Sequence, residues 1–517
     1  MNSIPIPKSL TISVPAARYS ALCIFLLAAP QIFAATCESL STLKLPNTII
    51  TLAHTEQGDL SALDNKTPGP PLKGLPPLCR VAGTISPVPD SVIGFEVWMP
   101  TSNWNHRFLE VGNGGFSGAP WIHFMAAAVR DGYATASTDT GHLGADFDGS
   151  FALGHPEKVI DFGYRSEHET AVKAKAIIAA FYGEPQKRAY WEGCSSGGKQ
   201  GLMEAQRYPN DFDGIIAGAP ANNWERLSAS SIWIEQATHL TPASSLPKEK
   251  LAILHQAALD ACDASDGVKD GVIRDTVSCH FDPAVIQCKS ADTAACLSPE
   301  QVEAARKIYA GPVNPRTHEK IFPGLEPGSE ISWYGFATPV FPIGASHFKN
   351  IIFKDPKWEA STLNFDTDIA IAEKVDSGTL TATNPNLKPF FAHGGKLILY
   401  HGLSDGLIAP QNTINYYNAV IEATGSAAVA SMRLYLAPGM GHCFGGDGPN
   451  DFDLDAPLAA WVEDNKAPGP ILALHFPANA PPTKPDRTRP LCPYPQVAKY
   501  KGTGGTDDAA NFACAKP

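Results

Sequence analysis

Apolar and polar positions predict strands and helices in turn over two separate regions of the chain. In the first region, apolar residues recur at helical spacing over 166–182 and 197–207. Short apolar runs bounded by turn residues predict the strands between and before these helices, at 91–98, 107–111, 133–138, 188–192 and 214–217. The same rhythm returns in the second region, with strands expected at 396–400, 432–436 and 471–476 and helices at 411–423 and 454–464. This alternation is typical of an α/β protein with a doubly wound parallel sheet.

The segment between the two regions has a different pattern. From 221 to 389 the chain contains amphipathic helical pieces, loops rich in proline and glycine, and four cysteines. We therefore expect one α/β domain formed by 35–220 and 390–517, interrupted by a large inserted lid domain at 221–389.

The first 34 residues have the pattern of a signal peptide. Lys8 and Arg18 precede the apolar stretch 21–29, and Ile32-Phe33-Ala34 provides a cleavage site after Ala34. The apolar run is too short to span a bilayer, and no later segment approaches 18 uninterrupted apolar residues. A retained anchor helix is the alternative; export to the periplasm or the medium is the prediction.

The cysteines agree with export. One of the eleven, Cys23, lies in the predicted signal, and the remaining ten indicate five disulfides in an oxidising compartment. No Cys-x-x-Cys pair occurs, which argues against a zinc ribbon or thioredoxin-like chemistry. The connectivity stays open at this point, although neighbours such as Cys262 and Cys279 are easily joined.

Net charge excludes one class of partner. The chain has 40 Lys and Arg against 52 Asp and Glu, a formal charge of −12, and no basic cluster. An acidic surface repels phosphate backbones, so we expect no binding to nucleic acid. We also expect no membrane partner.

The strongest chemical signal is Gly193-Cys194-Ser195-Ser196-Gly197, placed between a predicted strand and a predicted helix. A Gly-x-Ser-x-Gly turn in this setting presents its serine above the sheet edge, and the following helix N-terminus favours a developing oxyanion. Ser195 is therefore the predicted nucleophile, with a plain glycine-rich turn as the alternative.

A serine nucleophile needs a base and an acid that orients it, in the order Ser, Asp, His for this fold. Asp405 follows the strand 396–400, and His442 follows the strand 432–436, so both belong at the carboxyl edge of the sheet. The rivals are His401, and Asp139 with His142, which precede the serine. For His142 and His168 a structural role is the favoured interpretation.

Two further features accompany these residues. Cys194 and Cys443 adjoin the predicted nucleophile and base, so they can bridge if Ser195 and His442 are within hydrogen-bond reach; otherwise each pairs elsewhere. The run Gly112–Gly115 follows an early strand and suits an oxyanion hole, in which Gly114 or Gly115 and Ser196 donate their N–H groups. A glycine-rich turn is the alternative for that run.

The insertion contains an acidic loop at 263–272. Three carboxylates within eight residues, Asp263, Asp266 and Asp270, suit a hard cation that takes oxygen ligands. The spacing is not that of an EF-hand, and solvated Asx-turns are the alternative.

Together these motifs resemble the tannase and feruloyl esterase family, which also includes mono(2-hydroxyethyl) terephthalate hydrolases. The resemblance rests on Cys194-Ser195, Asp405 and His442-Cys443, with support from the loop at 112–115. It implies an α/β-hydrolase fold and a structural Ca²⁺ held by the side chains of Asp263, Asp266 and Asp270 and the carbonyls of Val268 and Val272. It also implies the disulfides Cys37–Cys79, Cys194–Cys443, Cys262–Cys279, Cys288–Cys296 and Cys492–Cys514.

The function that this resemblance implies is a secreted serine ester hydrolase acting on feruloyl, galloyl or related aromatic acid esters, free or attached to plant polysaccharide or polyphenol. An aromatic diacid monoester hydrolase and a general lipase or esterase are the enzymatic alternatives. A catalytically dead protein that binds polyphenol or carbohydrate is the alternative from another class. Aromatic residues of the insertion, such as Trp333, Tyr334 and Phe336, are candidates for stacking on a substrate ring.

Overall fold

The computed structural model describes residues 34–60, 71–239, 241–276, 278–291, 293–334, 341–477 and 484–517. The predicted signal segment 1–34 lies outside these ranges except for Ala34. Within the described ranges, no helix has the length and apolar character needed to cross a bilayer.

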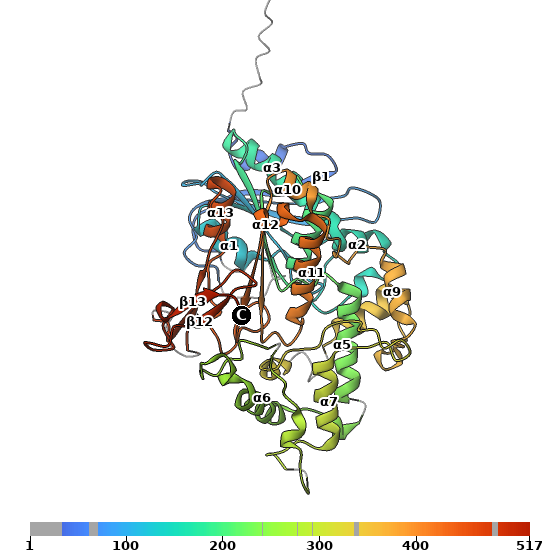
Figure 1. Cartoon of the computed structure of the whole chain (residues 1–517). Helices are drawn as coiled ribbons and strands as arrows, with labels where there is room; N and C mark the ends of the chain where they lie inside the picture. The colour runs from blue at the N-terminus through green and yellow to red at the C-terminus, as the bar shows by residue number, and fades with distance from the viewer. Residues whose placement is uncertain are drawn as a thin grey trace, which may run out of the picture.

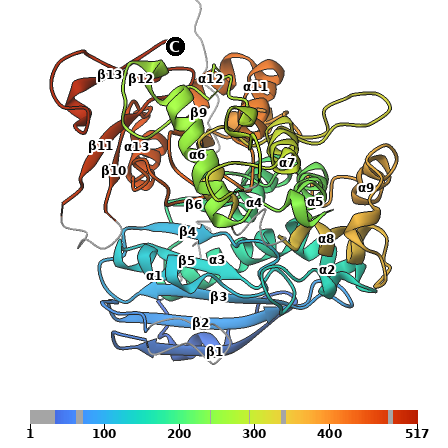
Figure 2. The same cartoon turned by 90° about the horizontal axis from the view of Figure 1, so that it is seen from below.

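A nine-stranded sheet runs through the centre of the molecule (Figures 1 and 2). Its strands follow the spatial order β1 (Thr48–Glu56), β2 (Leu78–Ile85), β3 (Ile93–Pro100), β5 (Ala134–Thr138), β4 (Arg107–Val111), β6 (Arg188–Cys194), β7 (Gly214–Gly218), β8 (Lys396–Gly402) and β9 (Met432–Ala437). The strands from β5 to β9 pair in parallel, whereas β1, β2, β3 and β5 pair antiparallel in sequence. The carboxyl ends of the parallel strands therefore meet along one edge.

Helices cover both faces of this sheet because its central strands are apolar on both sides. On β8, Leu397 and Leu399 belong to one buried cluster and Ile398 to the other. The first cluster lies under α3 (Ser166–Tyr182), α4 (Ser196–Arg207), α10 (Lys388–Ala392), α11 (Pro410–Thr424) and α12 (Ser426–Ser431). The second lies under α1 (Ile122–Arg130) and α13 (Asp455–Asp464). This two-residue alternation, with a helix layer on each side, gives the predicted α/β-hydrolase architecture.

The segment between β7 and β8 packs around a third buried cluster below the carboxyl edge of the sheet (Figure 1). Apart from α10, which packs against the sheet, the helices of this segment are α5 (Trp224–His239), α6 (Lys248–Cys262), α7 (Pro299–Ala310), α8 (Ile343–His347) and α9 (Asp368–Asp376). Phe116, Phe162 and Ile408 from the sheet domain join the same cluster, and α2 (Pro156–Ile160) lies beside it. The inserted segment thus has a core of its own that continues into the domain that carries it.

The C-terminal region differs from the expected rhythm. The strand predicted at 471–476 is β10 (Ile471–His475), but it pairs antiparallel with β11 (Arg487–Leu491) in a separate two-stranded sheet. A second small sheet joins β12 (Val497–Tyr500) and β13 (Phe512–Ala515). Pro493 and Tyr494 lie along β9, where the Tyr494 N–H donates to the Leu434 carbonyl at 2.8 Å. The free edge of β9 is therefore occupied, and β10 cannot extend the main sheet.

All five disulfides implied by the family resemblance are formed. Four of them close chain segments of 8 to 42 residues, whereas Cys194–Cys443 joins positions 249 residues apart. That bridge alone among the five connects the strand-to-helix turn after β6 with the loop after β9. This disulfide therefore belongs to the candidate site, whereas the other four stabilise local chain segments.

Candidate active site

Ser195 lies at the sharp turn between β6 and α4. Its backbone has a positive φ of 62°, a conformation that side-chain-bearing residues rarely adopt, and its N–H donates to the Gly218 carbonyl at 2.9 Å. Gly193 and Gly197 permit this turn, since a Cβ on Gly193 would lie 2.6 Å from the Gly197 backbone. The predicted serine elbow is thus present, with Ser196 as the first residue of the helix.

His442 is oriented by Asp405, as the sequence predicts. Its Nδ1 lies 2.8 Å from Oδ2 of Asp405, and the carboxylate is fully buried. Asp405 follows β8 and His442 follows β9, so neighbouring parallel strands bring them to the same sheet edge. This arrangement leaves Nε2 as the imidazole nitrogen available to a nucleophile.

Asp405 accepts four N–H groups in the described structure. Oδ2 receives His442 and His401, and Oδ1 receives the backbone N–H groups of Leu407 at 2.8 Å and Ile408 at 2.9 Å. Burial alone would raise the pKa of Asp405, but the charge of His442 and the hydrogen bonds from both histidines outweigh it and hold the pKa well below its usual range. The carboxylate therefore stays ionised when it orients His442.

His401 is not a rival base but a second partner of Asp405, a role that the sequence did not reveal. It is fully buried, and its Nε2 lies 3.0 Å from both Asp405 Oδ2 and the Ile408 carbonyl. Both neighbours are acceptors, so Nε2 must carry a proton. Nδ1 lies 2.7 Å from the Thr413 hydroxyl, and the ring is thereby held on both sides.

The other rivals are structural, as favoured from their order in the chain. His142 is buried against the Phe116 carbonyl and stacks on Phe151 with ring centroids 3.6 Å apart, and burial lowers its pKa to about 4. Asp139 accepts the backbone N–H groups of Gly94 and Gly141. His168 pairs with Asp211 at 2.6 Å and stacks on Tyr208.

The Cys194–Cys443 bridge ties the serine turn to the histidine loop. The Cα atoms of the two cysteines are 6.0 Å apart, and each cysteine is directly adjacent to Ser195 or His442. Ser195, His442 and both cysteines line one cavity of about 470 Å³. The structure therefore brings together the three residues predicted for catalysis and the disulfide beside them.

The glycine loop after β4 lies against the serine turn, as an oxyanion hole requires. The Ser196 hydroxyl donates to the Gly115 carbonyl at 2.9 Å, and the Gln200 side chain accepts the Asn113 N–H. A Cβ on Gly114 would meet the Trp121 ring at 2.5 Å. Among the described backbone hydrogen bonds, none is donated by the N–H of Gly114 or Gly115. Either N–H is therefore a candidate oxyanion-hole donor, together with the N–H of Ser196.

Aromatic side chains surround the cavity. Those of Phe124, Phe147, Tyr334 and Phe444 are 46–73 % exposed and form its rim. Of the predicted stacking residues, Tyr334 lines the cavity and Phe336 lies outside the described residues. Trp333 is fully buried, and its indole N–H donates to the Ser329 hydroxyl, so its predicted stacking role is wrong. Sequence alone did not separate these neighbours because all three are aromatic.

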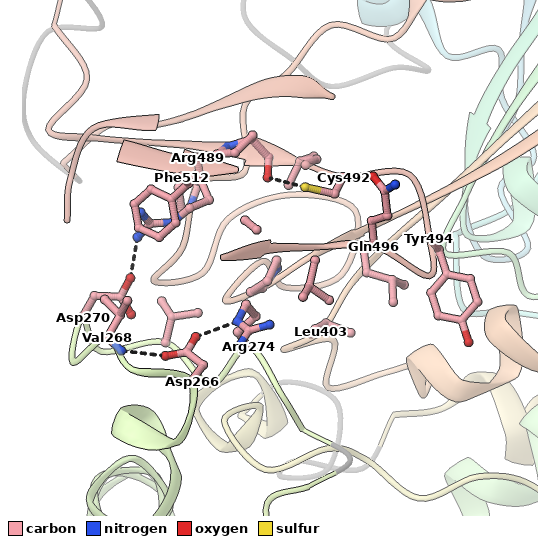
Figure 3. Close-up of a pocket in the computed structure, with 18 residues that line it drawn as sticks. Asp266, Val268, Asp270, Arg274, Leu403, Arg489, Cys492, Tyr494, Gln496 and Phe512 are labelled. Carbon is pink, nitrogen blue, oxygen red and sulfur yellow. Dashed lines mark hydrogen bonds and ion pairs between the residues drawn. The ribbon is translucent and has the colours of Figure 1, made fainter. Parts of the chain in front are cut away.

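The acidic loop of the insertion is held by hydrogen bonds and ion pairs (Figure 3). Asp263 accepts the backbone N–H groups of Asp270 and Gly271, which closes the loop on itself. Arg274 pairs with Asp266 at 2.8 Å, and Arg489 pairs with Asp270. The three carboxylates and nearby carbonyls have the chemistry that Ca²⁺ prefers. Among the described residues, however, their oxygens do not lie within 4.8 Å of one another as a set, so the three carboxylates would have to move closer together to bind one cation.

Comparison with known proteins gives the family. The family model described as tannase and feruloyl esterase matches residues 79–515. The chain belongs to this family. It is 38 % identical to an uncharacterized esterase of Xanthomonas campestris, over 93 % of this chain and 91 % of that one. It is 35 % identical to the mono(2-hydroxyethyl) terephthalate hydrolase of Piscinibacter sakaiensis, over 86 % and 85 % of the two chains.

A solved structure agrees. The crystal structure of feruloyl esterase B from Aspergillus oryzae superposes with a TM-score of 0.85 at 27 % identity, covering 93 % of this chain and 99 % of that one. The protein is therefore a carboxylic ester hydrolase of the feruloyl esterase and tannase type with an α/β-hydrolase fold.

Proposed function

We propose that this esterase is a secreted serine hydrolase that cleaves esters of aromatic or phenolic acids through Ser195, His442 and Asp405. One observation carries the proposal. The imidazole held by the buried Asp405 carboxylate is joined through Cys443 to the cysteine next to Ser195, and both side chains face one aromatic cavity.

In the proposed reaction, His442 Nε2 takes the proton of Ser195 Oγ as the oxygen bonds to the ester carbonyl carbon. The N–H groups of Ser196 and of Gly114 or Gly115 stabilise the negative charge that forms on the carbonyl oxygen. His442 then gives its proton to the departing alcohol, which leaves an acyl group on Ser195. Water, deprotonated by His442, attacks this acyl-enzyme; as the bond from the acyl carbon to Ser195 Oγ breaks and the acid leaves, His442 returns the proton to Oγ.

The substrate class is proposed from the cavity wall. Trp121, Phe124, Phe147 and Tyr334 offer flat apolar surfaces to an aromatic acyl group. Feruloyl, galloyl and related acids have such a ring, either in a small ester or in an ester attached to plant polysaccharide or polyphenol. An aromatic diacid monoester is the second candidate, since one relative is a mono(2-hydroxyethyl) terephthalate hydrolase.

A panel of methyl ferulate, methyl gallate, a terephthalate monoester and a long-chain fatty acid ester tests this function. We expect turnover of aromatic esters in the wild type and none above background in Ser195→Ala. Fastest turnover of the fatty ester would indicate a general lipase, and turnover of no ester would indicate a binding protein.

Secretion is part of the proposal and is supported by the five disulfides, which persist in oxidising compartments. N-terminal sequencing of protein from the periplasm or the medium should begin at Ala35. Recovery of the intact N-terminus only, from membranes, would instead indicate an anchor.

We propose further that the loop of Asp263, Asp266 and Asp270 binds a structural Ca²⁺, with the carbonyls of Val268 and Val272 as additional ligands. Bound Ca²⁺ stabilises only the native state, so a chelator should lower the Tm of the wild type while kcat of the folded enzyme stays unchanged. Asp263→Asn should lower the Tm and remove its response to Ca²⁺. A Tm that ignores both chelator and added Ca²⁺ would show that the two arginines hold the loop without a metal.

A further inference from the structure

The floor of the catalytic cavity contains two polar side chains that the mechanism does not use. Glu192 of β6 and Tyr400 of β8 both line the cavity together with Ser195. Trp191 points to the α4 face of the sheet, where its indole N–H donates to the Gly197 carbonyl, so Glu192 points to the opposite face. Tyr400 lies on that same face, two residues after Ile398.

Neither polar group is satisfied within the protein. In the described part of the chain, no hydrogen bond or ion pair is formed by the Glu192 carboxyl or the Tyr400 hydroxyl. Unpaired polar groups in a largely buried position cost stability unless a ligand or water pairs with them. Two such groups on one cavity floor therefore indicate a polar end of the substrate site.

The surroundings favour the neutral form of both groups. Burial and the negative charges of Asp455 and Asp453 raise the pKa of Glu192 to about 8. Burial and the charge of Glu192 likewise raise the pKa of Tyr400. Near neutral pH the pair consists of a carboxylic acid and a phenol, each of which can both donate and accept a hydrogen bond.

The walls above this floor suit a flat, uncharged ring. The Trp121 and Phe124 rings lie with centroids 5.1 Å apart, and the Trp121 ring excludes any side chain at Gly114. Among the described residues that line the cavity there is no lysine or arginine. A carboxylate on the ring would therefore find a carboxyl group and no cation at this end.

We propose that Glu192 and Tyr400 bind the phenolic hydroxyl of the acyl group and select hydroxylated aromatic acids over aromatic diacids. This inference rests on the proposed function and identifies residues that determine the substrate specificity of the enzyme. Glu192 lies on the strand that leads into the serine turn, three residues before Ser195, and its side chain lines the same cavity.

Three substrates that differ only at the para position test the inference: methyl cinnamate, methyl 4-hydroxycinnamate and methyl 4-carboxycinnamate. All three are methyl esters, so any preference among them arises from the acyl group. We expect kcat/KM of the wild type to be at least tenfold higher for the hydroxylated ester than for the unsubstituted one, and lowest for the carboxylated one.

Glu192→Leu should bring the ratio of hydroxylated to unsubstituted ester close to one by slowing only the former. Glu192→Gln, which can still donate and accept, should keep most of the preference, and Tyr400→Phe should lose part of it. Asp146→Asn is the matched control, since Asp146 is an exposed carboxyl on the same cavity and its change should leave the ratio intact.

Folding is checked by the Tm and by hydrolysis of p-nitrophenyl acetate, whose acyl group is too short to reach the floor. If Glu192→Leu does not fold, the Tyr400→Phe ratio decides instead, and a preference that is fully intact in that variant would overturn the inference. Equal wild-type rates for the hydroxylated and unsubstituted esters, or an intact preference in Glu192→Leu, would overturn the inference but not the proposed function. Absence of turnover of all three esters would overturn the inference, and the proposed function would fall with it only if methyl gallate and the terephthalate monoester are not hydrolysed either.

Discussion

Two carboxyl groups at the same sheet edge have opposite surroundings. Asp405, after β8, receives four N–H groups, and the pKa of this carboxyl is held well below its usual range. Glu192, on β6, receives none in the described structure, and burial, together with the negative charges of Asp455 and Asp453, raises the pKa of this carboxyl to about 8. Both line or adjoin the cavity of Ser195, yet one is kept charged and the other neutral.

The difference shows how one residue class serves two purposes in a single site. An ionised carboxylate fixes the orientation of His442 and stabilises the imidazolium formed during the reaction. A neutral carboxyl group in an aromatic cavity can instead exchange hydrogen bonds with an uncharged hydroxyl. Neighbouring N–H groups and charges, rather than burial alone, separate the two cases.

Asp405→Asn removes the charged carboxylate of this comparison and should have the largest effect on catalysis. Without the negative charge, the imidazole loses its favoured tautomer and its imidazolium partner, and kcat should fall roughly 10⁴-fold. Steady-state kinetics on methyl ferulate provides the measurement, with Glu192→Gln as the matched acid-to-amide control, expected to retain at least a tenth of wild-type kcat. Similar losses in both variants would contradict the division of roles.

Removal of the Cys194–Cys443 bridge should have the next largest effect. The double change to alanine frees the histidine loop from the serine turn, and a displacement near 1 Å can cost about a hundredfold in rate. We expect kcat to fall by that order while the Tm changes less. The double alanine variant of Cys492 and Cys514 should show the reverse pattern. A bridge-free enzyme with wild-type kcat would show that Ser195 and His442 are aligned without it.

A change at His401 tests how much one of the four hydrogen bonds to Asp405 contributes to catalysis. His401→Leu removes one N–H from Oδ2, which raises the pKa of Asp405 and makes the carboxylate a stronger partner for protonated His442. The acid limb of the kcat/KM profile should therefore move to higher pH, and kcat should fall about tenfold, or ~1.4 kcal/mol. His401→Gln supplies an N–H and should restore most of both. An unchanged profile in His401→Leu would reduce His401 to a packing residue.

Glu192 gives the smallest effect, and it concerns stability. The pKa of Glu192 is about 8 in the folded protein and about 4.3 in the unfolded chain. The folded state therefore binds this proton more tightly, and the free energy of unfolding falls as the pH rises from about 4.3 to about 8. Glu192→Gln should leave the Tm unchanged at pH 4 and raise it by about 1–3 °C at pH 8. Calorimetry at the two pH values measures this, and a gain of the same size at both would contradict the assigned titration.

Much of this arrangement could be predicted because it depends on local patterns and chain order. The strands and helices around Ser195, and the loops of Asp405 and His442, follow from hydrophobic periodicity and from the rule that ligands lie at carboxyl strand ends. The cysteines beside Ser195 and His442 pointed to their pairing. These features need no knowledge of distant contacts.

Other features depend on contacts that the sequence does not display. His401 was recognised only as a rival base, because its hydrogen bond to Asp405 depends on side-chain packing around the Thr413 hydroxyl. The raised pKa of Glu192 depends first on burial in the folded protein and then on Asp455 and Asp453, which are more than 250 positions away in the chain. The separate β10–β11 sheet arises because Pro493 and Tyr494 occupy the edge of β9.

The central claim is that Ser195 is the nucleophile activated by the Asp405-oriented histidine. Labelling the folded enzyme with a fluorophosphonate, followed by peptide mapping, tests it most directly. We predict stoichiometric modification of Ser195 in the wild type, much slower labelling in Asp405→Asn, and none in Ser195→Ala. Modification of another residue, or equal labelling of Ser195→Ala, would contradict the assignment of the site.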